Sequence, residues 1–211
     1  MKAIIKGREP HSLITHRLTP YADYDNYPDK VSLRRALASE QRGLCCYCMG
    51  PIRPEASAMK IEHWRCQSRY PDEQLDYNNL LGACMGGEGR SQRRQHCDTR
   101  KGDRDLLWNP AEPVHAIESR VQYGADGTIE SDNETLDSQL NEILNLNLAL
   151  LKQNRKSVLD AVLQWWKRRK PVPRHRIERQ IRRLAPADGS LDPYCQVAVW
   201  WLNRKLSRMP R

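Results

Sequence analysis

Four short segments decide the fold of this chain: GLCCYC (residues 43–48), KIEHW (60–64), NNLLGAC (78–84) and CDTRKGD (97–103). Nearly all of the seven cysteines lie in or between them. Seven cysteines cannot all form disulfides with one another, and a reducing compartment disfavours such bonds. The spacing of Cys45 and Cys48 lets two thiolates reach one tetrahedral ion, whereas a redox pair would need a thioredoxin-like βαβ context that is missing here. The cysteines therefore indicate a metal framework.

We expect one structural zinc ion (Zn²⁺) per chain, bound by Cys45, Cys48, Cys84 and Cys97. His96 precedes Cys97 directly and is an alternative fourth ligand. The other cysteines, which are Cys46, Cys66 and Cys195, are expected to be small buried hydrophobic residues.

Charge is distributed unevenly along the 211 residues. The net charge of the whole chain is +9, but residues 151–211 carry 16 Lys or Arg and four Asp or Glu, a net charge of +12. Such a segment usually meets phosphate or forms a solvated helical face. The N-terminal residues lack an apolar stretch of signal-peptide length, and no later segment approaches a membrane span, so we expect a cytoplasmic protein without membrane contact.

Local patterns predict mostly helices outside the cysteine-rich segment. Apolar residues in 1–31 follow neither the helical nor the strand period, so this segment is expected to be an extended lead-in. A helix is expected over 33–42, with Ser32 as its cap and Gly43 as its end. Apolar residues at 114, 117, 121 and 123, a GADG turn at 124–127 and Thr128-Ile129 predict a hairpin. Further helices are expected over 134–144, 147–169, 174–184 and 193–208, the last with Asp192 as cap and Pro193 at its first position.

Two tryptophan pairs each run into a basic cluster. Trp165-Trp166 precede residues 167–170 (KRRK), and Trp200-Trp201 precede Arg204-Lys205. Because each pair belongs to an amphipathic helical pattern, we expect the indole rings to pack in the core rather than to stack on nucleic-acid bases.

The order of these motifs resembles the His-Asn-His (HNH) endonucleases of the ββα-metal fold. The generic resemblance covers about residues 44–106: Cys-x-x-Cys, an acid followed by His, Asn-Leu-x-x-x-Cys, and Cys-Asp-x-x-Lys-Gly. KGREP (6–10), EQRGLCCYC (40–48) and LNLN (144–147) are similar to the PtuB-like HNH nuclease subunit of Septu-type and retron-associated anti-phage systems. The chain departs from the general HNH pattern at two places. A long glycine-rich basic loop, 85–96, stands where a short Cys-x-x-Cys is usual, and Asp98 stands where many HNH proteins have Asn or His.

The resemblance implies the roles of five residues. His63 would be the general base that takes a proton from water, as neutral imidazole can near pH 7. Glu62 and Asp98 would hold one catalytic Mg²⁺ or Mn²⁺, a hard ion that prefers carboxylate and water. Asn79 would hydrogen-bond near His63 and orient its ring. Lys101, on the same helical face as Asp98, would meet a phosphate.

The expected fold is α+β: a zinc-braced, treble-clef-like ββα-metal module with a β-hairpin and a helical C-terminal region. Its parts are a lead-in and helix (1–43), the HNH nuclease module (44–112) and the hairpin with the basic helices (113–211). The expected function is cleavage of DNA or RNA as the nuclease subunit of an anti-phage complex. The resemblance implies a separate ABC/SMC-like ATPase partner, and the chain has no Gly-x-x-x-x-Gly-Lys-[Ser/Thr] loop of its own. A non-catalytic zinc-stabilised binding or adaptor module and an RNA (tRNA) nuclease remain alternatives, and the oligomeric state stays open.

Overall fold

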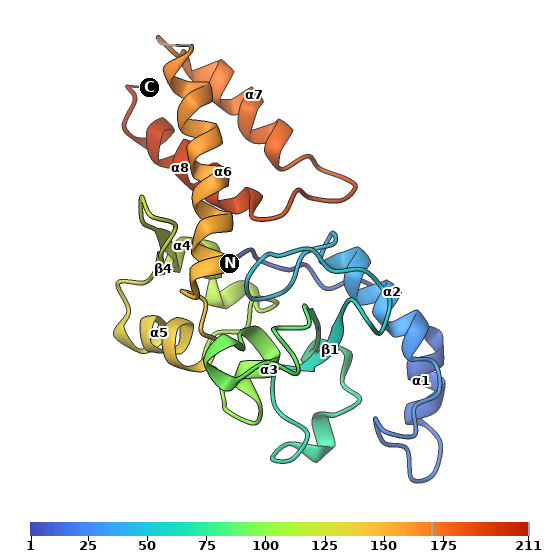
Figure 1. Ribbon diagram of the computed structural model, residues 1–211. Coiled ribbons are helices and arrows are strands. Elements are labelled where there is room, and N and C mark those ends of the chain that lie inside the picture. Colours follow the sequence, from blue (N-terminus) through green and yellow to red (C-terminus); the bar gives the residue numbers. More distant parts are fainter. Residues whose placement is uncertain (170, 211) are drawn as a thin grey trace.

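The computed structural model describes residues 1–169 and 171–210 and has an α+β architecture (Figure 1). The helices are α1 (His11–Arg17), α2 (Lys30–Glu40), α3 (Cys97–Lys101), α4 (Ile117–Arg120), α5 (Glu134–Ser138), α6 (Ala149–Lys167), α7 (Arg174–Leu184) and α8 (Cys195–Ser207). The strands are β1 (Lys60–His63), β2 (Leu80–Ala83), β3 (Gln122–Tyr123) and β4 (Ile129–Glu130). Among the described residues, no helix is long and apolar enough to cross a membrane.

The first sheet is the antiparallel pair β1–β2, in which Glu62 lies opposite Leu81 and His63 opposite Leu80. Gly82 of β2 is closely surrounded, because a Cβ atom there would approach side chains of the neighbouring loop to 2.9 Å. The Gln41 side chain bonds both backbone groups of Gly82: its Nε2 donates to the carbonyl (2.7 Å) and its Oε1 accepts from the amide (2.5 Å). This buried amide thus closes the open edge of β2.

The N-terminal segment is more regular than expected. Residues 11–17 form α1, whose first turn follows Pro10 and whose Leu13 is fully buried. One buried residue in a seven-residue helix leaves too little periodicity to be detected. The prediction of an extended lead-in over 1–31 was therefore wrong for this part.

The next helix starts earlier than predicted and has a different cap. In α2 the Asp29 carboxylate accepts a hydrogen bond from the Ser32 amide at 3.0 Å, so Asp29 is the N-cap and Ser32 lies inside the helix. Both residue types are favoured caps, and they stand three residues apart. The prediction of Ser32 was wrong because the helix extends one more turn toward the N-terminus.

The predicted hairpin is confirmed at its turn but is shorter than expected. Strands β3 and β4 pair antiparallel, and the Gly124 amide bonds the Thr128 carbonyl across the turn (2.9 Å). Val114 lies exposed in a 3₁₀ turn, and Ile117 begins α4. Their spacing of three residues fits a helical turn as well as part of a strand, which explains the error.

The C-terminal helices are confirmed with shifts at their ends. The segment 134–144 divides into α5 and a π-helical turn over Gln139–Ile143, whereas α7 has the predicted bounds. Helix α8 starts at Cys195 after Tyr194, which has a left-handed backbone (φ 61°), so Asp192 and Pro193 lie in a turn before it rather than at the cap and first helical position. The four Trp side chains at 165, 166, 200 and 201 are half-buried and pack against the core, as predicted.

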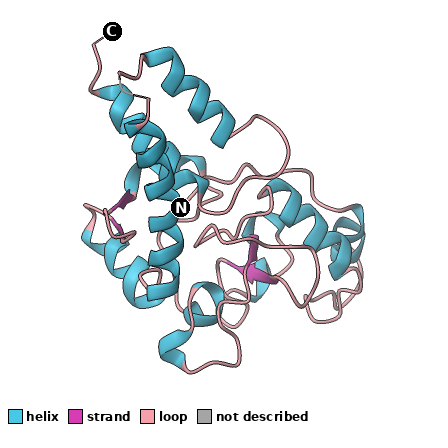
Figure 2. Cartoon of the chain, turned by 45° about the horizontal axis from the view of Figure 1, so that its top comes forward, coloured by secondary structure: helices cyan, strands magenta, loops and turns pink. Residues whose placement is uncertain are grey.

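Helices α6, α7 and α8 pack together at one end of the molecule, and β1 and α3 lie toward the other (Figures 1 and 2). Arg155 of α6 is completely buried and donates to the carbonyls of Gly127 (2.6 Å) and Leu146 (2.8 Å). It thereby fixes the hairpin turn against α6.

Candidate metal centre and candidate active site

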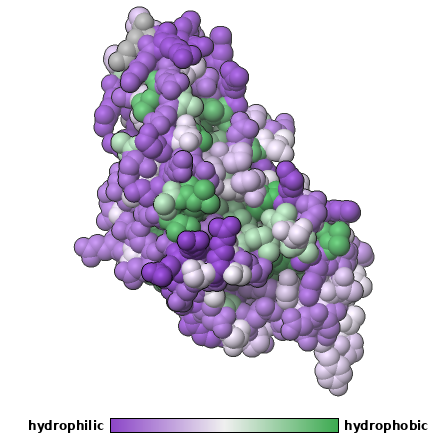
Figure 3. All heavy atoms as spheres, viewed as in Figure 1, coloured by the Kyte–Doolittle hydropathy of each residue, from purple (hydrophilic) through white to green (hydrophobic). Residues whose placement is uncertain are grey.

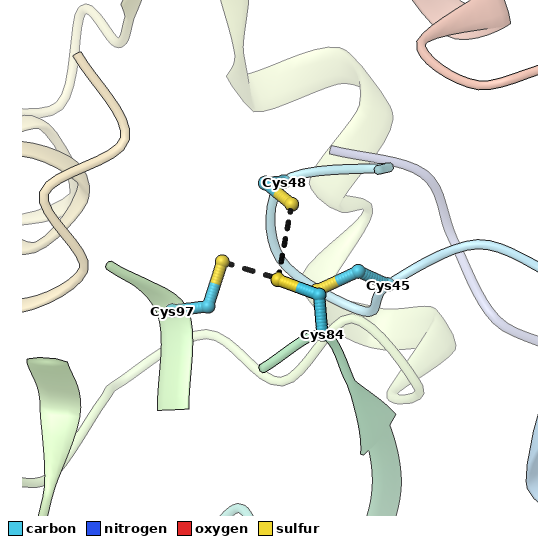
Figure 4. Close-up of side chains that lie close together, drawn as sticks. All are labelled: Cys45, Cys48, Cys84 and Cys97. Atoms are coloured by element: carbon cyan, nitrogen blue, oxygen red, sulfur yellow. Dashed lines mark hydrogen bonds between the residues drawn. The ribbon is translucent and has the colours of Figure 1, made fainter. Parts of the chain in front are cut away.

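Four cysteine side chains meet in the interior: Cys45, Cys48, Cys84 and Cys97. Their sulfur atoms all lie within 4.8 Å of one another, and could hold a metal ion such as zinc (Figure 4). The Cys45–Cys97 and Cys48–Cys84 sulfur separations are 3.8 and 3.7 Å. A tetrahedral ion with Zn–S bonds of about 2.3 Å places its ligands about 3.8 Å apart, so the observed spacing fits zinc.

A tight turn positions the first two thiols. The Met49 amide bonds the Cys45 carbonyl (3.1 Å), and the Cys45 amide bonds the Gly50 carbonyl (2.8 Å). The Gly50 amide also points at the Cys48 sulfur, 3.3 Å away. A Cβ at position 50 would lie 3.2 Å from that sulfur, so glycine allows this close approach.

The long loop between Cys84 and Cys97 does not prevent closure of the cluster. The His96 amide donates to the Gly86 carbonyl at 2.9 Å and brings the two ends of the loop together. Gly86 has a left-handed backbone (φ 56°), and a Cβ there would approach the His96 carbonyl to 2.3 Å. The predicted ligands therefore converge despite the twelve intervening residues.

His96 lies beside the cluster without belonging to it. Its Nδ1 is 3.2 Å from the Cys97 sulfur and 3.9 Å from the Cys84 sulfur. The four thiols form the cluster, so Cys97 supplies the fourth sulfur and His96 is placed to hydrogen-bond it. Cys46, Cys66 and Cys195 are buried outside this group, as expected of small hydrophobic residues.

The four thiols of the cluster differ in acidity: the pKa values of Cys45 and Cys84 are lowered, whereas those of Cys48 and Cys97 are raised well above the usual value. Burial by itself raises the pKa of the Cys45 thiol, but hydrogen bonds from the neighbouring thiols hold that pKa well below its usual value. Thiolate is the form that binds metal, so Cys45 and Cys84 are the two thiols of the cluster that lose their protons most readily.

A second group of polar side chains gathers where β1 ends and α3 begins. Glu62 and His63 are the last two residues of β1, while Asp98 and Lys101 lie on α3, whose first residue is the cluster member Cys97. The predicted catalytic residues are thus brought to one place through the sheet and the cysteine cluster.

Glu62 is 2% exposed and has two partners on one carboxylate oxygen. The Tyr47 hydroxyl donates to Oε1 at 2.6 Å, and the Lys101 ammonium lies 2.8 Å from the same atom. Burial and the adjacent Asp98 carboxylate raise the pKa of Glu62 well above its usual value. The Glu62 and Asp98 carboxyls therefore form a coupled pair that favours holding a proton between them.

Asp98 carries the negative charge of this pair. Burial opposes its ionisation, yet the hydrogen bond with Glu62 and the Lys60 ammonium, 3.0 Å from Oδ2, lower its pKa. Its side chain is less enclosed than that of Glu62, so Asp98 is the more accessible oxygen donor. Paired carboxylates suit Mg²⁺ or Mn²⁺, which bind proteins through one or two such groups and complete their shell with water and phosphate.

His63 is held in one tautomer. Its Nε2 lies 3.0 Å from the Gln74 carbonyl, which can only accept, so Nε2 carries the proton and Nδ1 keeps a lone pair. The ring meets Tyr24 edge-on at 4.5 Å between centroids. Burial lowers the pKa of His63 to about 4, and the Lys101 charge acts in the same direction. The imidazole is therefore neutral at pH 7.

Lys101 does not occupy the position expected of a phosphate contact. It is 1% exposed, and besides its ion pair with Glu62 its ammonium donates to the His63 carbonyl at 2.8 Å. Lys101 lies on the same helix as Asp98, as its spacing predicted. Its side chain, however, turns inward and pairs with the buried Glu62 carboxylate. We correct its predicted role accordingly.

Asn79 bonds the backbone around the site. Its Nδ2 donates to the carbonyls of Arg65 (3.0 Å) and Glu73 (3.1 Å), and its Oδ1 accepts from the Arg65 amide (2.7 Å). These bonds fix the loop that ends at Gln74, so Asn79 acts on the His63 ring through that loop.

Sequence reasoning missed four contributors: Tyr24, Tyr47, Lys60 and Gln74. Tyr47 stands inside the Cys-x-x-Cys unit and Lys60 begins the KIEHW segment, so both were near recognised motifs. Tyr24 and Gln74 contact His63 only through tertiary folding, and no local pattern marks them.

No protein-family model matches this chain, and the search of curated proteins produced no match.

Proposed function

We propose that the chain is a metal-dependent HNH-type endonuclease that hydrolyses phosphodiester bonds of nucleic acid. The observation that carries this proposal is a neutral His63, whose Nε2 proton is held by the Gln74 carbonyl, directly after Glu62, the carboxyl that pairs with Asp98. The chain order β1, β2, α3, with the cysteine cluster bracing it, agrees with a ββα-metal arrangement and supports the same assignment.

Each group has a distinct task in this proposal. His63 takes a proton from the attacking water at Nδ1, while the Gln74 carbonyl holds the ring orientation. Glu62 and Asp98 would bind Mg²⁺ or Mn²⁺, which stabilises negative charge on phosphoryl oxygens when bound. Lys101 balances charge in the interior and keeps the Glu62 carboxylate in place.

The proposed setting is an anti-phage complex with a separate ABC/SMC-like ATPase, in the cytoplasm. It rests on the resemblance to PtuB-like subunits carried by residues 6–10, 40–48 and 144–147. The lack of a phosphate-binding Gly-x-x-x-x-Gly-Lys-[Ser/Thr] loop in the printed sequence agrees with nucleotide control by another subunit.

A zinc-stabilised binding module without catalysis is the second candidate. Two observations favour it: Lys60 and Lys101 already neutralise the carboxylates, and His63 is 7% exposed. A binding module, however, has no need for an acidic pair beside a neutral imidazole with a free lone pair.

Cleavage assays separate the two candidates. Purified protein is incubated with plasmid DNA and, separately, with total RNA in Mg²⁺ or Mn²⁺, and with the product of the neighbouring gene where activity requires it. The nuclease proposal predicts metal-dependent products that disappear in His63→Ala, and the preferred nucleic acid identifies the substrate. Binding without metal-dependent cleavage under all these conditions would leave the non-catalytic module.

A further inference from the structure

Exposed arginines form a stripe along α7. Ile177 and Ile181 face the core on one side of this helix, and α7 packs on α8. Arg176, Arg179 and Arg183 are all exposed and recur at the three- and four-residue spacing of one helical face. At 1.5 Å per residue the stripe is about 10 Å long. We call these three residues the arginine stripe.

The ends of the neighbouring helices add charge at the same end of the molecule. The C-terminal ends of α6 and α8 lie near the N-terminal end of α7 (Figure 1), and hydrophilic side chains cover this region (Figure 3). Exposed basic residues there are Lys167, Arg168, Arg169, Arg204 and Arg208.

Tryptophan rings hold several of these cations in position. Arg169 lies over Trp165 (5.6 Å to the ring centroid), Arg204 over Trp200 (4.8 Å) and Lys205 over Trp201 (4.9 Å). Cation–π contacts limit the freedom of long side chains, so less entropy is lost when an anion binds.

Acidic side chains do little to neutralise this end. Glu178 pairs with Arg174, and Asp160 pairs with Lys156 farther along α6. Asp188 and Asp192 lie on the connection between α7 and α8, which the Arg42 side chain ties to the end of α2. Two cavities of about 320 and 600 Å³ open between α6 and α8, and among the described residues no carboxylate lines either one.

The apolar pattern argues against two alternative partners on physical grounds. A membrane-binding helix would insert its apolar face, but Ile177 of α7 is completely buried within the protein. A protein interface usually has an apolar centre. The large hydrophobic residues that are strongly exposed lie between positions 5 and 150, and none occurs among the described residues of 151–210.

We propose that the arginine stripe, with the adjoining ends of α6 and α8, is a sequence-independent binding surface for the phosphate backbone of nucleic acid. This inference rests on the proposed nuclease function for its choice of polyanion. Exposed arginines without a structured base-reading element supply phosphate contacts, which position the nucleic acid and carry no sequence information. The surface lies apart from β1 and α3, so it would hold a substrate at a distance from the site of cleavage (Figure 1).

The test measures binding separately from cleavage. A labelled DNA duplex and a labelled single-stranded RNA are titrated with the full chain, zinc retained and Mg²⁺ and Mn²⁺ absent, between about 50 and 200 mM salt. The variant is Arg176→Gln/Arg179→Gln/Arg183→Gln. On duplex DNA the slope of log K against log salt is expected to fall by about 2 to 3, and Kd at about 100 mM salt to rise at least tenfold.

The matched control removes the same charge elsewhere. Arg8, Arg35 and Arg53 are exposed and lie outside α6–α8, so changing all three to Gln is expected to leave most of the slope intact. Circular dichroism and zinc content verify that both variants are folded. An unchanged slope in the α7 variant, or equal losses in both variants, would overturn the inference and leave α7 to an acidic protein partner. Arginine-dependent binding without cleavage in Mg²⁺ or Mn²⁺, both with and without the product of the neighbouring gene, would instead overturn the nuclease proposal alone.

Discussion

The segment 44–112 and the C-terminal helices differ in the length of their regular elements and in what fills their interiors. Strands β1 and β2 have four residues each and α3 has five, whereas α6 has 19 and α8 has 13. The segment 44–112 encloses four thiols, the Glu62 carboxyl and the Lys101 ammonium, together with apolar side chains of its strands and loops. The helices enclose aliphatic and aromatic side chains.

The two regions therefore differ in the interactions that stabilise them. Elements of four or five residues cannot hold together through their own hydrogen bonds, so a metal ion held by the cysteine cluster would add cross-links to the apolar contacts of the segment 44–112. The helices bury enough apolar surface to pack without a metal. The cluster also joins the start of α3, which carries Asp98, to the sheet whose strand β1 carries Glu62 and His63.

Loss of one cluster thiol should have the largest effect, and it should affect the segment 44–112 far more than the C-terminal helices. Cys48→Ser is expected to abolish stoichiometric zinc and to unfold the segment 44–112, because structural zinc sites contribute about 10 kcal/mol or more to folding. Helices α6–α8 should retain much of their circular dichroism. Elemental analysis and far-ultraviolet spectra of the purified protein measure the two effects.

Cys46→Ser is the matched control, since Cys46 is buried next to the cluster but is not part of it. It should retain zinc. A Cys48→Ser protein with one zinc per chain and unchanged unfolding would contradict the assignment of the cluster.

Replacing the proposed base should lower the cleavage rate without changing the fold or the zinc content of the segment 44–112. His63→Ala is expected to lower the cleavage rate by about 10²- to 10⁴-fold, the usual cost of losing a positioned base. Zinc content, folding and nucleic-acid affinity should stay near those of the unaltered protein, because none of the cluster ligands changes. Single-turnover cleavage and elemental analysis provide the measurements.

The carboxylate variants refine this test. Glu62→Ala and Asp98→Ala should also be inactive, but through weaker metal binding, so higher Mg²⁺ or Mn²⁺ should restore part of their activity and none of that of His63→Ala. Unchanged cleavage by His63→Ala would remove the catalytic assignment, and loss of zinc with activity would make His63 a structural residue.

In the helical region, the buried Arg155 guanidinium should contribute most to the free energy of unfolding. Arg155→Ala leaves the carbonyls of Gly127 and Leu146 without their buried donor, and is expected to cost about 3 kcal/mol in the free energy of unfolding. Lys156→Ala is the neighbouring control, because its ion pair with Asp160 is exposed and contributes about 0.5 kcal/mol or less. Urea unfolding compares the two, and equal destabilisation would contradict the role of Arg155. Zinc content should be unchanged in both variants.

The sequence was most informative where the determining contacts are local. Helix α7 matches its predicted bounds because its hydrophobic period and the prolines before it lie within a few residues. Cys45 and Cys48 were identifiable because zinc ligands occur as characteristic Cys-x-x-Cys pairs, whereas Cys84 and Cys97, twelve residues apart, were predicted as the two cysteines that could complete such a site. Helix starts were less certain: Asp29 and Ser32 are both suitable caps, and only packing decides between them.

The inner contacts of the candidate site depend on tertiary folding. Lys101 has the right spacing for a surface cation beside Asp98, but the buried Glu62 carboxyl draws its ammonium inward. Gln74 reaches His63 from a loop whose shape is set by Asn79. No pattern along the chain encodes such a contact, since it requires the loop and β1 to be placed first.

The smallest expected effect concerns the contact between the end of α2, directly before the segment 44–112, and the connection that joins α7 to α8. The Arg42 guanidinium, at the end of α2, donates to three carbonyls of the α7–α8 connection: Pro186, Asp188 and Gly189, at 2.7 to 2.9 Å. Because these bonds are partly solvated, Arg42→Ala is expected to cost about 1 kcal/mol. Arg53→Ala, which lines the same cavity from an exposed position, is the control and should be nearly neutral. If this contact couples the C-terminal helices to the rest of the chain, calorimetry of Arg42→Ala should separate unfolding of the helices from that of the segment 44–112. A single transition, unshifted relative to Arg53→Ala, would show that the shared hydrophobic core alone joins them.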